Sequence, residues 1–319
     1  MTGRTILVTG GCGFIGSNFL KKIIHSQEFE RVINLDVQTY AGNIDNIREF
    51  LELPYFVNKK EDIRNRDKIH EIFSDYKPDI VVNFAAESHV DRSIENPSLF
   101  IETNIYGTQN LIDSSISSGV KRFVQISTDE VYGDLEENDP PFTELSPINP
   151  SSPYSASKAS ADFLVLAAVR THGFPALIAR CSNNYGKHQH PEKLIPKVII
   201  NSFSGKPIPV YGKGRNVRDW IFVDDFCEGI STMLSRGKVG EIYNFGGNCE
   251  IRNIDLVRKI INHTNSSEEL IKFVEDRPGH DFRYAMNFEK SENDLGWRPK
   301  VDFDEGLDNT ISWYSSKSR

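Results

Sequence analysis

The sequence predicts an α/β protein built on a doubly wound parallel sheet, followed by a smaller α+β lobe. Two observations carry this prediction. Through the first 190 residues, short runs rich in β-branched and aromatic residues alternate with longer stretches of helical apolar spacing, which is typical of a parallel sheet covered by helices. Beyond about Pro191 the alternation loosens. We therefore expect one domain over 1–190 and a second over 191–319.

Composition argues against several classes of protein. The chain has 319 residues, of which 38% are hydrophobic and 26% charged, and its net charge is -8. Two lobes are expected at this length, because single cores stop growing at roughly 250 to 300 residues. No apolar run approaches the roughly 18 residues that indicate a membrane span, and the negative charge argues against nucleic acid as a partner. The first predicted strand begins at Thr5, too early for a signal peptide, so we expect a cytoplasmic protein.

The cysteines do not suggest a metal or redox site. Cys12, Cys181, Cys227 and Cys249 show neither C-x-x-C spacing nor a dense disulfide pattern. Such spacing is typical of reduced, structural thiols. We expect no metal site and no catalytic cysteine.

The first element pair contains a glycine-rich turn. Residues 5–8 predict a strand and residues 14–24 a helix, and between them Gly10, Gly13 and Gly16 form a G-x-x-G-x-x-G pattern. Without side chains, such a turn is tight and lets a pyrophosphate approach the N-terminus of the helix. The sequence therefore predicts a Rossmann-type dinucleotide site.

The next strand specifies the dinucleotide. Residues 32–35 form an apolar run that ends at Asp36, twenty residues after Gly16, where a carboxylate accepts hydrogen bonds from a ribose hydroxyl. Asp36 would repel a 2′-phosphate, and Val37 and Gln38 supply no cation. NAD is therefore favoured over NADP, with a simple turn residue as the alternative reading of Asp36.

The alternation continues through the rest of the first domain. Strands are predicted over 55–57, 80–84 and 122–126, with helices over 66–73 and 97–117. Asp62 and Ile63 follow one strand, and Ala85 and Ala86 follow another. Ligands of parallel sheets bind at these carboxyl ends, so we expect the cofactor there, although helix packing explains the alanines equally well.

The strand over 122–126 leads into Ser127–Gly133, which carries the Thr128 hydroxyl and two adjacent carboxylates, Asp129 and Glu130. Neighbouring carboxylates spread their pKa values, so that one is charged and the other neutral. After an irregular stretch over 136–153, Tyr154 and Lys158 lie four residues apart on a predicted helix. On one helical face, the ammonium can lower the pKa of the phenol. These residues predict a dehydrogenase site with an added acid/base pair.

The remaining chain is less regular. A sixth strand is predicted over 177–180, followed by a polar loop over 181–186. Short strands near 208–211 and 241–245, with helices near 224–234 and 253–263, indicate the smaller α+β lobe.

These motifs resemble those of the extended short-chain dehydrogenase/reductases, most closely the nucleotide-diphosphate-glucose 4,6-dehydratases, over nearly the whole length. The matching stretches are Thr9–Gly16, Thr39–Asn43, Ala85–Ser93, Ser127–Gly133, Ser152–Lys158, Arg180–Gly186 and Val217–Trp220.

The resemblance implies a set of contacts for each ligand. The residues implied for NAD, besides the glycines, are Phe14, Ile15, Asp36, Asp62, Ile63, Ala85, Ala86, Thr103, Tyr154, Lys158 and Asn184. Those implied for a nucleotide-diphosphate sugar are Ser88, Thr128, Asn183, Lys193, Leu194, Pro209, Tyr211, Arg218, Asn253, Arg277 and His280. Arg218 and Arg277 would neutralise the negative charge of the diphosphate. A homodimer formed through helices 97–117 and 154–171 is also implied.

The chain departs from the family pattern at Val37, Lys187, His190, Phe226, Phe282 and Asn287. The catalytic residues are unaffected. The nucleobase and sugar stay open: dTDP-glucose is favoured, and UDP- or CDP-linked sugars are alternatives.

The implied reaction is dehydration to a 4-keto-6-deoxy sugar. Tyr154 and Lys158 would serve oxidation at C4 with Thr128 on the oxygen, Glu130 would remove the C5 proton, and Asp129 would protonate the departing C6 hydroxyl. A sugar-nucleotide 4-epimerase would share the NAD site but needs no acid/base pair. A non-catalytic NAD-binding scaffold is the alternative from another class, and the intact set of proton-transfer residues argues against it.

Overall fold

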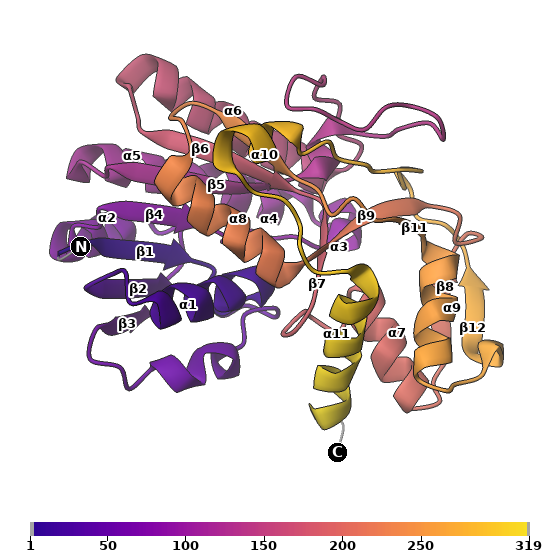
Figure 1. Ribbon diagram of the computed structural model, residues 1–319. Coiled ribbons are helices and arrows are strands. Elements are labelled where there is room, and N and C mark those ends of the chain that lie inside the picture. The colour runs from indigo at the N-terminus through magenta and orange to yellow at the C-terminus, as the bar shows by residue number, and fades with distance from the viewer. Residues whose placement is uncertain (1–2, 318–319) are drawn as a thin grey trace.

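The main body of the protein is a seven-stranded parallel sheet, seen in a computed structural model that describes residues 3–317 (Figure 1). The strand order is β10-β6-β5-β4-β1-β2-β3. The strands are β1 (Thr5–Thr9), β2 (Arg31–Leu35), β3 (Phe56–Lys59), β4 (Ile80–Asn83), β5 (Arg122–Thr128), β6 (Ala176–Cys181) and β10 (Ile242–Phe245). This order confirms the predicted doubly wound α/β fold.

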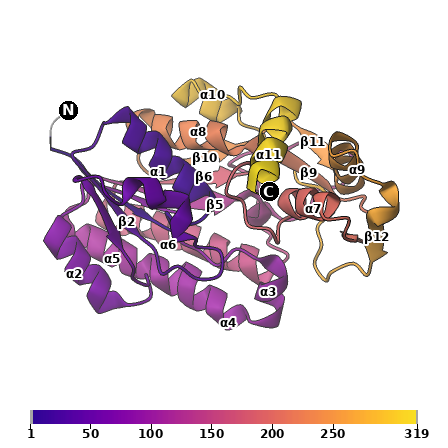
Figure 2. The same ribbon diagram turned by 90° about the horizontal axis from the view of Figure 1, so that it is seen from below.

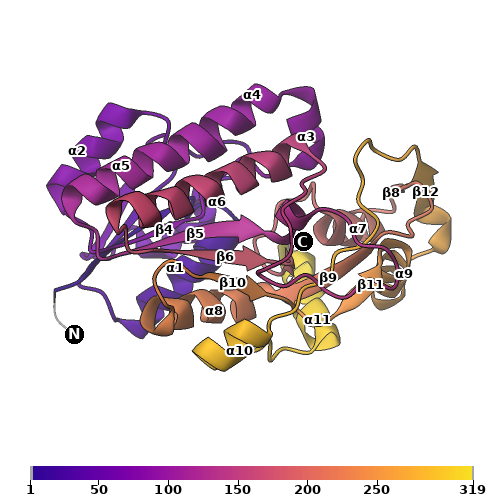
Figure 3. The ribbon, with the colours of Figure 1, turned by 90° about the horizontal axis from the view of Figure 1, so that it is seen from above.

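Helices cover both faces of the sheet (Figure 3). One face is covered by α2 (Arg66–Tyr76), α4 (Pro97–Phe100), α5 (Thr108–Ser118) and α6 (Pro153–His172), the other by α1 (Phe14–Ser26) and α8 (Val223–Arg236). Within β1, Ile6 and Val8 belong to the core under α1 and α8, whereas Leu7 belongs to the opposite core. Side chains alternate along a strand, so an apolar run such as residues 6–8 requires helices on both faces.

One predicted helix is interrupted. Between α4 and α5, residues Ile101–Gly107 form a π-helical segment, η2. Asn104 in this segment donates hydrogen bonds to the carbonyl of Glu87 (3.0 Å) and to Ser157 Oγ (2.8 Å), and accepts one from the Glu87 amide (2.9 Å). These contacts hold the widened turn against the end of β4, and π segments are frequent beside functional sites.

The smaller lobe has two short sheets (Figure 2). One contains β7 (Asn183–Tyr185), β9 (Val217–Phe222) and β11 (Glu250–Arg252), and the other pairs β8 (Ile208–Tyr211) with β12 (Ile271–Val274). Helices α7 (Leu194–Phe203), α9 (Asn253–His263) and α11 (Phe303–Lys317) pack with them around one core. Residues 183–185, predicted as loop, are a strand because they pair in parallel with β9.

Two predicted elements of the smaller lobe belong to the main body instead. Strand β10 pairs in parallel with β6 through Ile242 and Ile178, and α8 packs against α1. The chain therefore returns to the main sheet after 191. The local pattern identifies a short strand but not the strand it pairs with, which is why the predicted division followed chain order rather than packing.

The irregular connection over 134–152 reaches the smaller lobe. Isolated bridges join Leu135 to Arg283 and Phe142 to Met286. The remaining elements are η1 (Ile44–Phe50), α3 (Val90–Glu95), η3 (Asp129–Tyr132), η4 (Glu268–Leu270) and α10 (Glu289–Leu295). Of the helices within 3–317, none combines the length and hydropathy of a bilayer span.

Candidate active site

The glycine turn after β1 leaves no room for side chains. Gly10 has φ +70°, and a Cβ there would lie 2.7 Å from the Ala85 amide nitrogen. A Cβ on Gly16 would lie 2.3 Å from the Gly10 carbonyl oxygen. Gly13 caps α1 without a side-chain hydrogen bond. The N-terminus of α1 is thus approached by bare backbone, as a pyrophosphate site requires.

The Asp36 carboxylate is fixed at the end of β2. Its two oxygens accept hydrogen bonds from the amides of Cys12 (2.9 Å) and Gln38 (2.7 Å). Burial raises the pKa of Asp36, and these two amide contacts oppose that effect. The contacts hold the carboxylate in one orientation at the rim of the glycine turn, where it can accept hydrogen bonds from ribose hydroxyls.

A single cavity of about 490 Å³ joins the glycine turn to Ser127–Gly133, the loop that carries Asp129 and Glu130 and is called the acidic loop below. It is lined by every residue predicted for the cofactor: Gly10, Gly13, Phe14, Ile15, Gly16, Asp36, Asp62, Ile63, Ala85, Ala86, Thr103, Tyr154, Lys158 and Asn184. Thr128, Asp129 and Glu130 line it too. The residues present therefore fit an extended dinucleotide whose reactive end lies beside the proposed acid and base.

The acidic loop forms one turn of helix, η3, at the end of β5. Thr128 caps this turn, its Oγ1 accepting a hydrogen bond from the Glu130 amide (3.2 Å) and donating one to Asp129 Oδ1 (3.1 Å). The second carboxyl oxygen of Asp129 is buried without a hydrogen-bond partner among residues 3–317. A buried, partly unsatisfied carboxyl favours its protonated form.

The two carboxyl groups differ in their surroundings. Burial raises the pKa of Asp129 well above its usual range, and the charge of Glu130 raises it further. Burial raises the pKa of Glu130 as well, but Arg277, Lys193 and Arg218 all oppose this. Burial thus raises the pKa of both carboxyls, more strongly at Asp129, whereas three cations oppose the effect at Glu130. A difference of this kind is expected of an acid and a base.

Tyr154 and Lys158 lie one turn apart on α6, which begins with a capping box at Ser152 and Ser155. Lys158 Nζ donates to the carbonyl of Ile126 (2.6 Å). Burial raises the pKa of Tyr154 well above its usual value, with Glu130 the next cause, and burial lowers the pKa of Lys158. Burial and the nearby carboxylates therefore favour the neutral phenol here, and the expected influence of the Lys158 ammonium acts against them.

The substrate residues fall into two groups. Ser88, Thr128, Asn183 and Lys193 line the cavity, and Lys193 Nζ donates to the Ser88 carbonyl (2.9 Å). The others lie outside its lining: Leu194, Pro209, Tyr211, Arg218, Asn253, Arg277 and His280. Arg277 and Arg218 nevertheless influence the pKa of Glu130, so both guanidinium groups lie within electrostatic reach of the cavity.

Most of the outer group already has partners within the protein. Tyr211 Oη donates to Asp91 (2.9 Å), and Arg277 Nη1 lies 3.5 Å from the other oxygen of Asp91. His280 Nδ1 lies 2.6 Å from Asp276.

Arg218 is buried more deeply. Its guanidinium donates to the carbonyls of Val217 (2.7 Å), Phe282 (3.3 Å) and Asp281 (2.9 Å). It also lies over the ring of Tyr284, 4.3 Å from the centroid.

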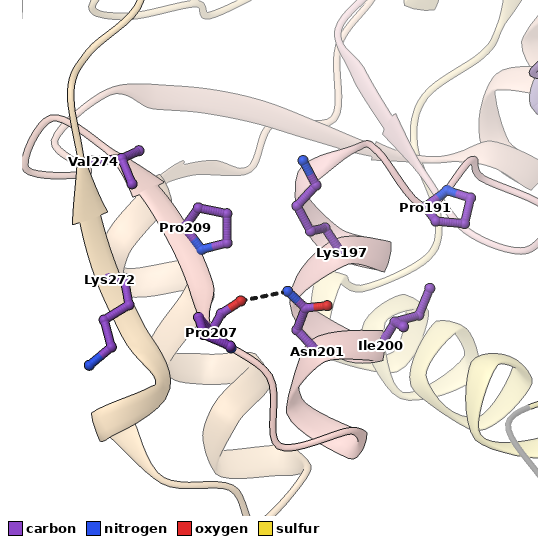
Figure 4. Close-up of a pocket in the computed structure, with 8 residues that line it drawn as sticks. All are labelled: Pro191, Lys197, Ile200, Asn201, Pro207, Pro209, Lys272 and Val274. Atoms are coloured by element: carbon purple, nitrogen blue, oxygen red, sulfur yellow. Dashed lines mark hydrogen bonds between the residues drawn. The ribbon is translucent and has the colours of Figure 1, made fainter.

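Pro209 lines a second cavity, also of about 490 Å³, between α7 and the β8–β12 pair (Figure 4). Lys197, Pro191 and Lys272 line it as well, and Asn201 Nδ2 donates to the Pro207 carbonyl (2.7 Å). Neither the acidic loop nor the glycine turn contributes to this cavity.

Some residues that line the main cavity were missed from the sequence. The Arg92 guanidinium lies 3.6 Å from the centroid of the Tyr40 ring, and His190 meets the same ring edge-on at 5.4 Å. Glu192 lies 3.5 Å from Arg92 and 3.6 Å from His190. The stretches holding Tyr40 and Arg92 were recognised as motifs, but no local spacing indicates that they meet. No group of three or more His, Cys, Asp or Glu side chains within 3–317 is arranged to hold a metal ion.

Comparison with known proteins agrees with this geometry. The family model described as GDP-mannose 4,6 dehydratase matches residues 7–310. A dTDP-glucose 4,6-dehydratase of Haemophilus influenzae is 48% identical, over 97% of this chain and 97% of its own length. A crystal structure of the Streptomyces venezuelae dTDP-glucose 4,6-dehydratase with NAD bound has a TM-score of 0.95 and 43% identity, over 98% of this chain and 97% of that one.

A neighbouring family shares the fold at lower identity. The UDP-glucose 4-epimerase of Thermotoga maritima has a TM-score of 0.92 but 28% identity, over 99% of this chain and 100% of that one. Sequence identity is thus higher to the dehydratases than to this epimerase, although the backbones agree almost equally well. The chain belongs to the nucleotide-sugar 4,6-dehydratases, the family whose model covers residues 7–310.

Proposed function

We propose that the protein is an NAD-dependent hydro-lyase that converts dTDP-glucose to dTDP-4-keto-6-deoxyglucose. The substrate follows from relatives such as those of Haemophilus influenzae, at 48% identity, and Streptomyces venezuelae, at 43% identity, which are dTDP-glucose 4,6-dehydratases. One observation carries the reaction type: Asp129 and Glu130 line the same cavity as Tyr154 and Lys158. The cavity therefore combines groups for oxidation with an acid and a base for elimination.

The order of steps follows from the chemistry of the sugar. The C5 proton of a hexose is not acidic until a neighbouring carbonyl can hold the resulting negative charge. NAD, when bound, supplies the oxidation at C4 by accepting hydride and the later reduction at C6 by returning it. The protein must therefore take the proton of the C4 hydroxyl, remove the C5 proton, protonate the departing C6 hydroxyl, and return a proton to C5 when hydride returns to C6.

Tyr154 would accept the proton of the C4 hydroxyl. It would do so as the phenolate, while the Thr128 hydroxyl hydrogen-bonds the C4 oxygen. Burial keeps the pKa of the phenol high, so the base form needs positive charge on the same face of α6. Lys158, one turn away, supplies that charge.

The two carboxyl groups of the acidic loop would transfer the protons at C5 and C6. Glu130 would remove the C5 proton, because its charged form is stabilised by Arg277, Lys193 and Arg218. Asp129, whose pKa burial holds high, would keep its proton for the departing C6 hydroxyl. A 4-epimerase needs neither group, so this pair supports dehydration rather than epimerisation.

We also propose a division of labour between the two parts of the chain. Residues 1–190 would bind NAD and supply the catalytic residues, and 191–319 would mainly bind the sugar nucleotide. The deep placement of Arg218 and the position of Arg277 beside Asp91 support this, because a diphosphate could draw Arg277 from a long contact of 3.5 Å into a shorter, charge-assisted one.

Incubation with a panel of dTDP-, UDP- and CDP-linked hexoses tests the proposal. Mass spectrometry should detect loss of one water from dTDP-glucose, and a reductive trap should locate the carbonyl at C4. Water loss from a UDP- or CDP-sugar alone would retain the reaction and correct the nucleotide. Interconversion of C4 epimers without water loss would overturn the reaction type.

A homodimer is proposed for the face formed by η2 and α6. These two elements pack together, and they expose Ile101 by 54%, Tyr106 by 51% and Phe163 by 55%. Large apolar side chains gathered on adjoining helices favour contact with another copy. Phe163→Glu should shift sedimentation from dimer toward monomer, and an unchanged profile would exclude this face.

The cysteines support a reducing compartment, and we propose the cytoplasm. All four are free. Burial raises the pKa of Cys12 to about 12 and raises the pKa of Cys227 well above its usual value. Such thiols stay protonated and unreactive.

A further inference from the structure

A buried ion pair lies behind the Tyr154 and Lys158 pair. Asp162 follows Lys158 by four residues on α6, and its Oδ2 lies 3.0 Å from Arg180 Nε on β6. The two side chains are only 1% and 2% exposed. Ser127 Oγ on β5 donates to the same oxygen (3.0 Å). Because desolvation offsets most of the attraction in a buried pair, stability alone is a weak reason for it.

The pair is held rigidly from the far side. The Arg180 guanidinium lies 4.8 Å from the centroid of the Tyr132 ring, and Tyr132 Oη donates to Asn244 Oδ1 (2.8 Å) on β10. The contacts thus connect α6 with three neighbouring strands, β5, β6 and β10. The carboxylate of Asp162 cannot turn away from α6 without breaking contacts to two of them.

Lys158 needs a counter-charge in this position. It is buried, and its Nζ donates to the neutral carbonyl of Ile126 (2.6 Å). Burial lowers the pKa of Lys158, and Asp162 is the largest influence in the opposite direction, ahead of Cys181. Burial raises the pKa values of Cys181, Tyr154 and Asp129, so these neighbours favour their neutral forms. Burial raises the pKa of Asp162 as well, but Arg180 is the largest influence that opposes this, followed by Lys158. Arg180 and Lys158 therefore both favour the ionised carboxylate.

We propose that Asp162 is a positioning residue that acts through Lys158. From the next turn of α6 it supplies the buried negative charge that keeps Lys158 an ammonium beside Tyr154, while Arg180 and Ser127 fix its orientation. Residues four apart on a helix are neighbours, and an opposite charge favours the charged form of a nearby lysine without a direct ion pair. The inference rests on the proposed function, in which the phenolate of Tyr154 requires a charged Lys158.

The first test is the pH profile of turnover. In Asp162→Asn, the high-pH limb should move down by about one pH unit or more, because Lys158 loses its proton more easily. Asp162→Glu keeps the charge and should restore the limb. Ser127→Ala is the comparison variant: it removes one hydrogen bond to Asp162 without changing a charge, so its limb should move much less than that of Asp162→Asn.

A second readout needs no substrate and covers the case in which Asp162→Asn does not fold. The double variant Asp162→Asn/Arg180→Gln removes both charges and leaves no unpaired guanidinium. Its loss of stability relative to wild type should be largest near neutral pH and should shrink toward about pH 10. The reason is that a neutral Lys158 no longer needs the carboxylate. Ser127→Ala should lose stability equally across the range.

The outcomes separate the two proposals. If the high-pH limb stays in place in Asp162→Asn and the stability difference does not vary with pH, Asp162 is a packing residue only. Loss of the proposed function would instead appear in the wild-type protein, as failure to form a 4-keto sugar. The stability measurement would still decide the role of Asp162 in that case.

Discussion

The residues proposed for the cofactor and those proposed for the sugar nucleotide differ in the kind of partner they have within the fold. Asp36 and Lys158 bond to backbone groups, whereas Tyr211, Arg277 and His280 pair with carboxylates. Asp36, Tyr154 and Lys158 line one cavity and lie at strand ends or on one helix face. Tyr211, Arg277 and His280 are instead paired with Asp91 or Asp276 outside that cavity. On the proposed roles, the first group is preorganised for its ligand, whereas the second would exchange internal carboxylate contacts for substrate contacts. Differential binding of this kind favours specificity.

The largest expected effect tests the preorganised part. Tyr154→Phe should reduce turnover about 10²- to 10⁴-fold, because the phenol is the proposed base for the first step. No ketone should be trapped and no C5 proton should exchange with deuterated solvent, since both follow oxidation. Tyr76→Phe removes a phenol hydroxyl from the end of α2 and should be near wild type. Ketone formation by the Tyr154 variant would contradict the assignment.

Substitutions in the acidic loop should block the steps after oxidation and leave oxidation itself intact, whereas Tyr154→Phe blocks every step. Glu130→Gln should still form a trappable 4-ketone but lose C5 exchange and water loss, by about 10²- to 10⁴-fold. Asp129→Asn should keep C5 exchange and lose only elimination, because the base survives. The exposed Glu137→Gln is the matched control. Near-normal dehydration by Glu130→Gln would show that another group is the base.

A third prediction concerns Asp219, a buried carboxyl on β9 of the smaller lobe whose pKa burial raises, as it does for Asp129. Asp219 accepts hydrogen bonds from the amides of Gly247 (3.0 Å) and Cys249 (2.8 Å), and burial raises its pKa from 3.8 to about 6. A pKa raised by folding gives stability that is present below about pH 4 and lost as pH rises through about 6. The loss is on the order of 3 kcal/mol.

Urea unfolding of wild type and Asp219→Asn measures this loss. Between about pH 4 and about pH 7, the variant should gain roughly 3 kcal/mol of stability relative to wild type. Any constant cost of the amide cancels in this comparison, and other carboxyls titrate alike in both proteins. A pH-independent difference would mean that Asp219 is ionised throughout.

The smallest effect tests the exchange of partners in the substrate lobe. Arg277→Ala should weaken sugar-nucleotide binding about tenfold, at the low end for a charge-assisted contact, because the contact with Asp91 is given up when substrate binds. NAD binding should be unchanged. Arg298→Ala removes the same charge from a 71% exposed side chain and should affect neither ligand. Equal losses of both ligands with Arg277→Ala would indicate a folding defect.

The sequence was most informative where function depends on local spacing. Asp36 follows Gly16 by twenty residues, and Tyr154 precedes Lys158 by four. Such distances are fixed by a strand end or a helical turn, which is why all the predicted cofactor residues line one cavity. The doubly wound fold was confirmed for the same reason, since alternating strands and helices leave few arrangements.

Sequence by itself therefore determined the family and the parallel sheet, and it supplied the predicted NAD and acid/base residues, which the fold brings to one cavity. Tertiary structure alone decided that β10 and α8 return to the main body and that residues 101–107 widen into a π segment. It also decided that Asp162 meets Arg180, and that three cations oppose at Glu130 the effect of burial that raises the pKa of Asp129. Burial and charge at a side chain depend on residues distant in the chain, and local spacing carries no information about which of them will meet.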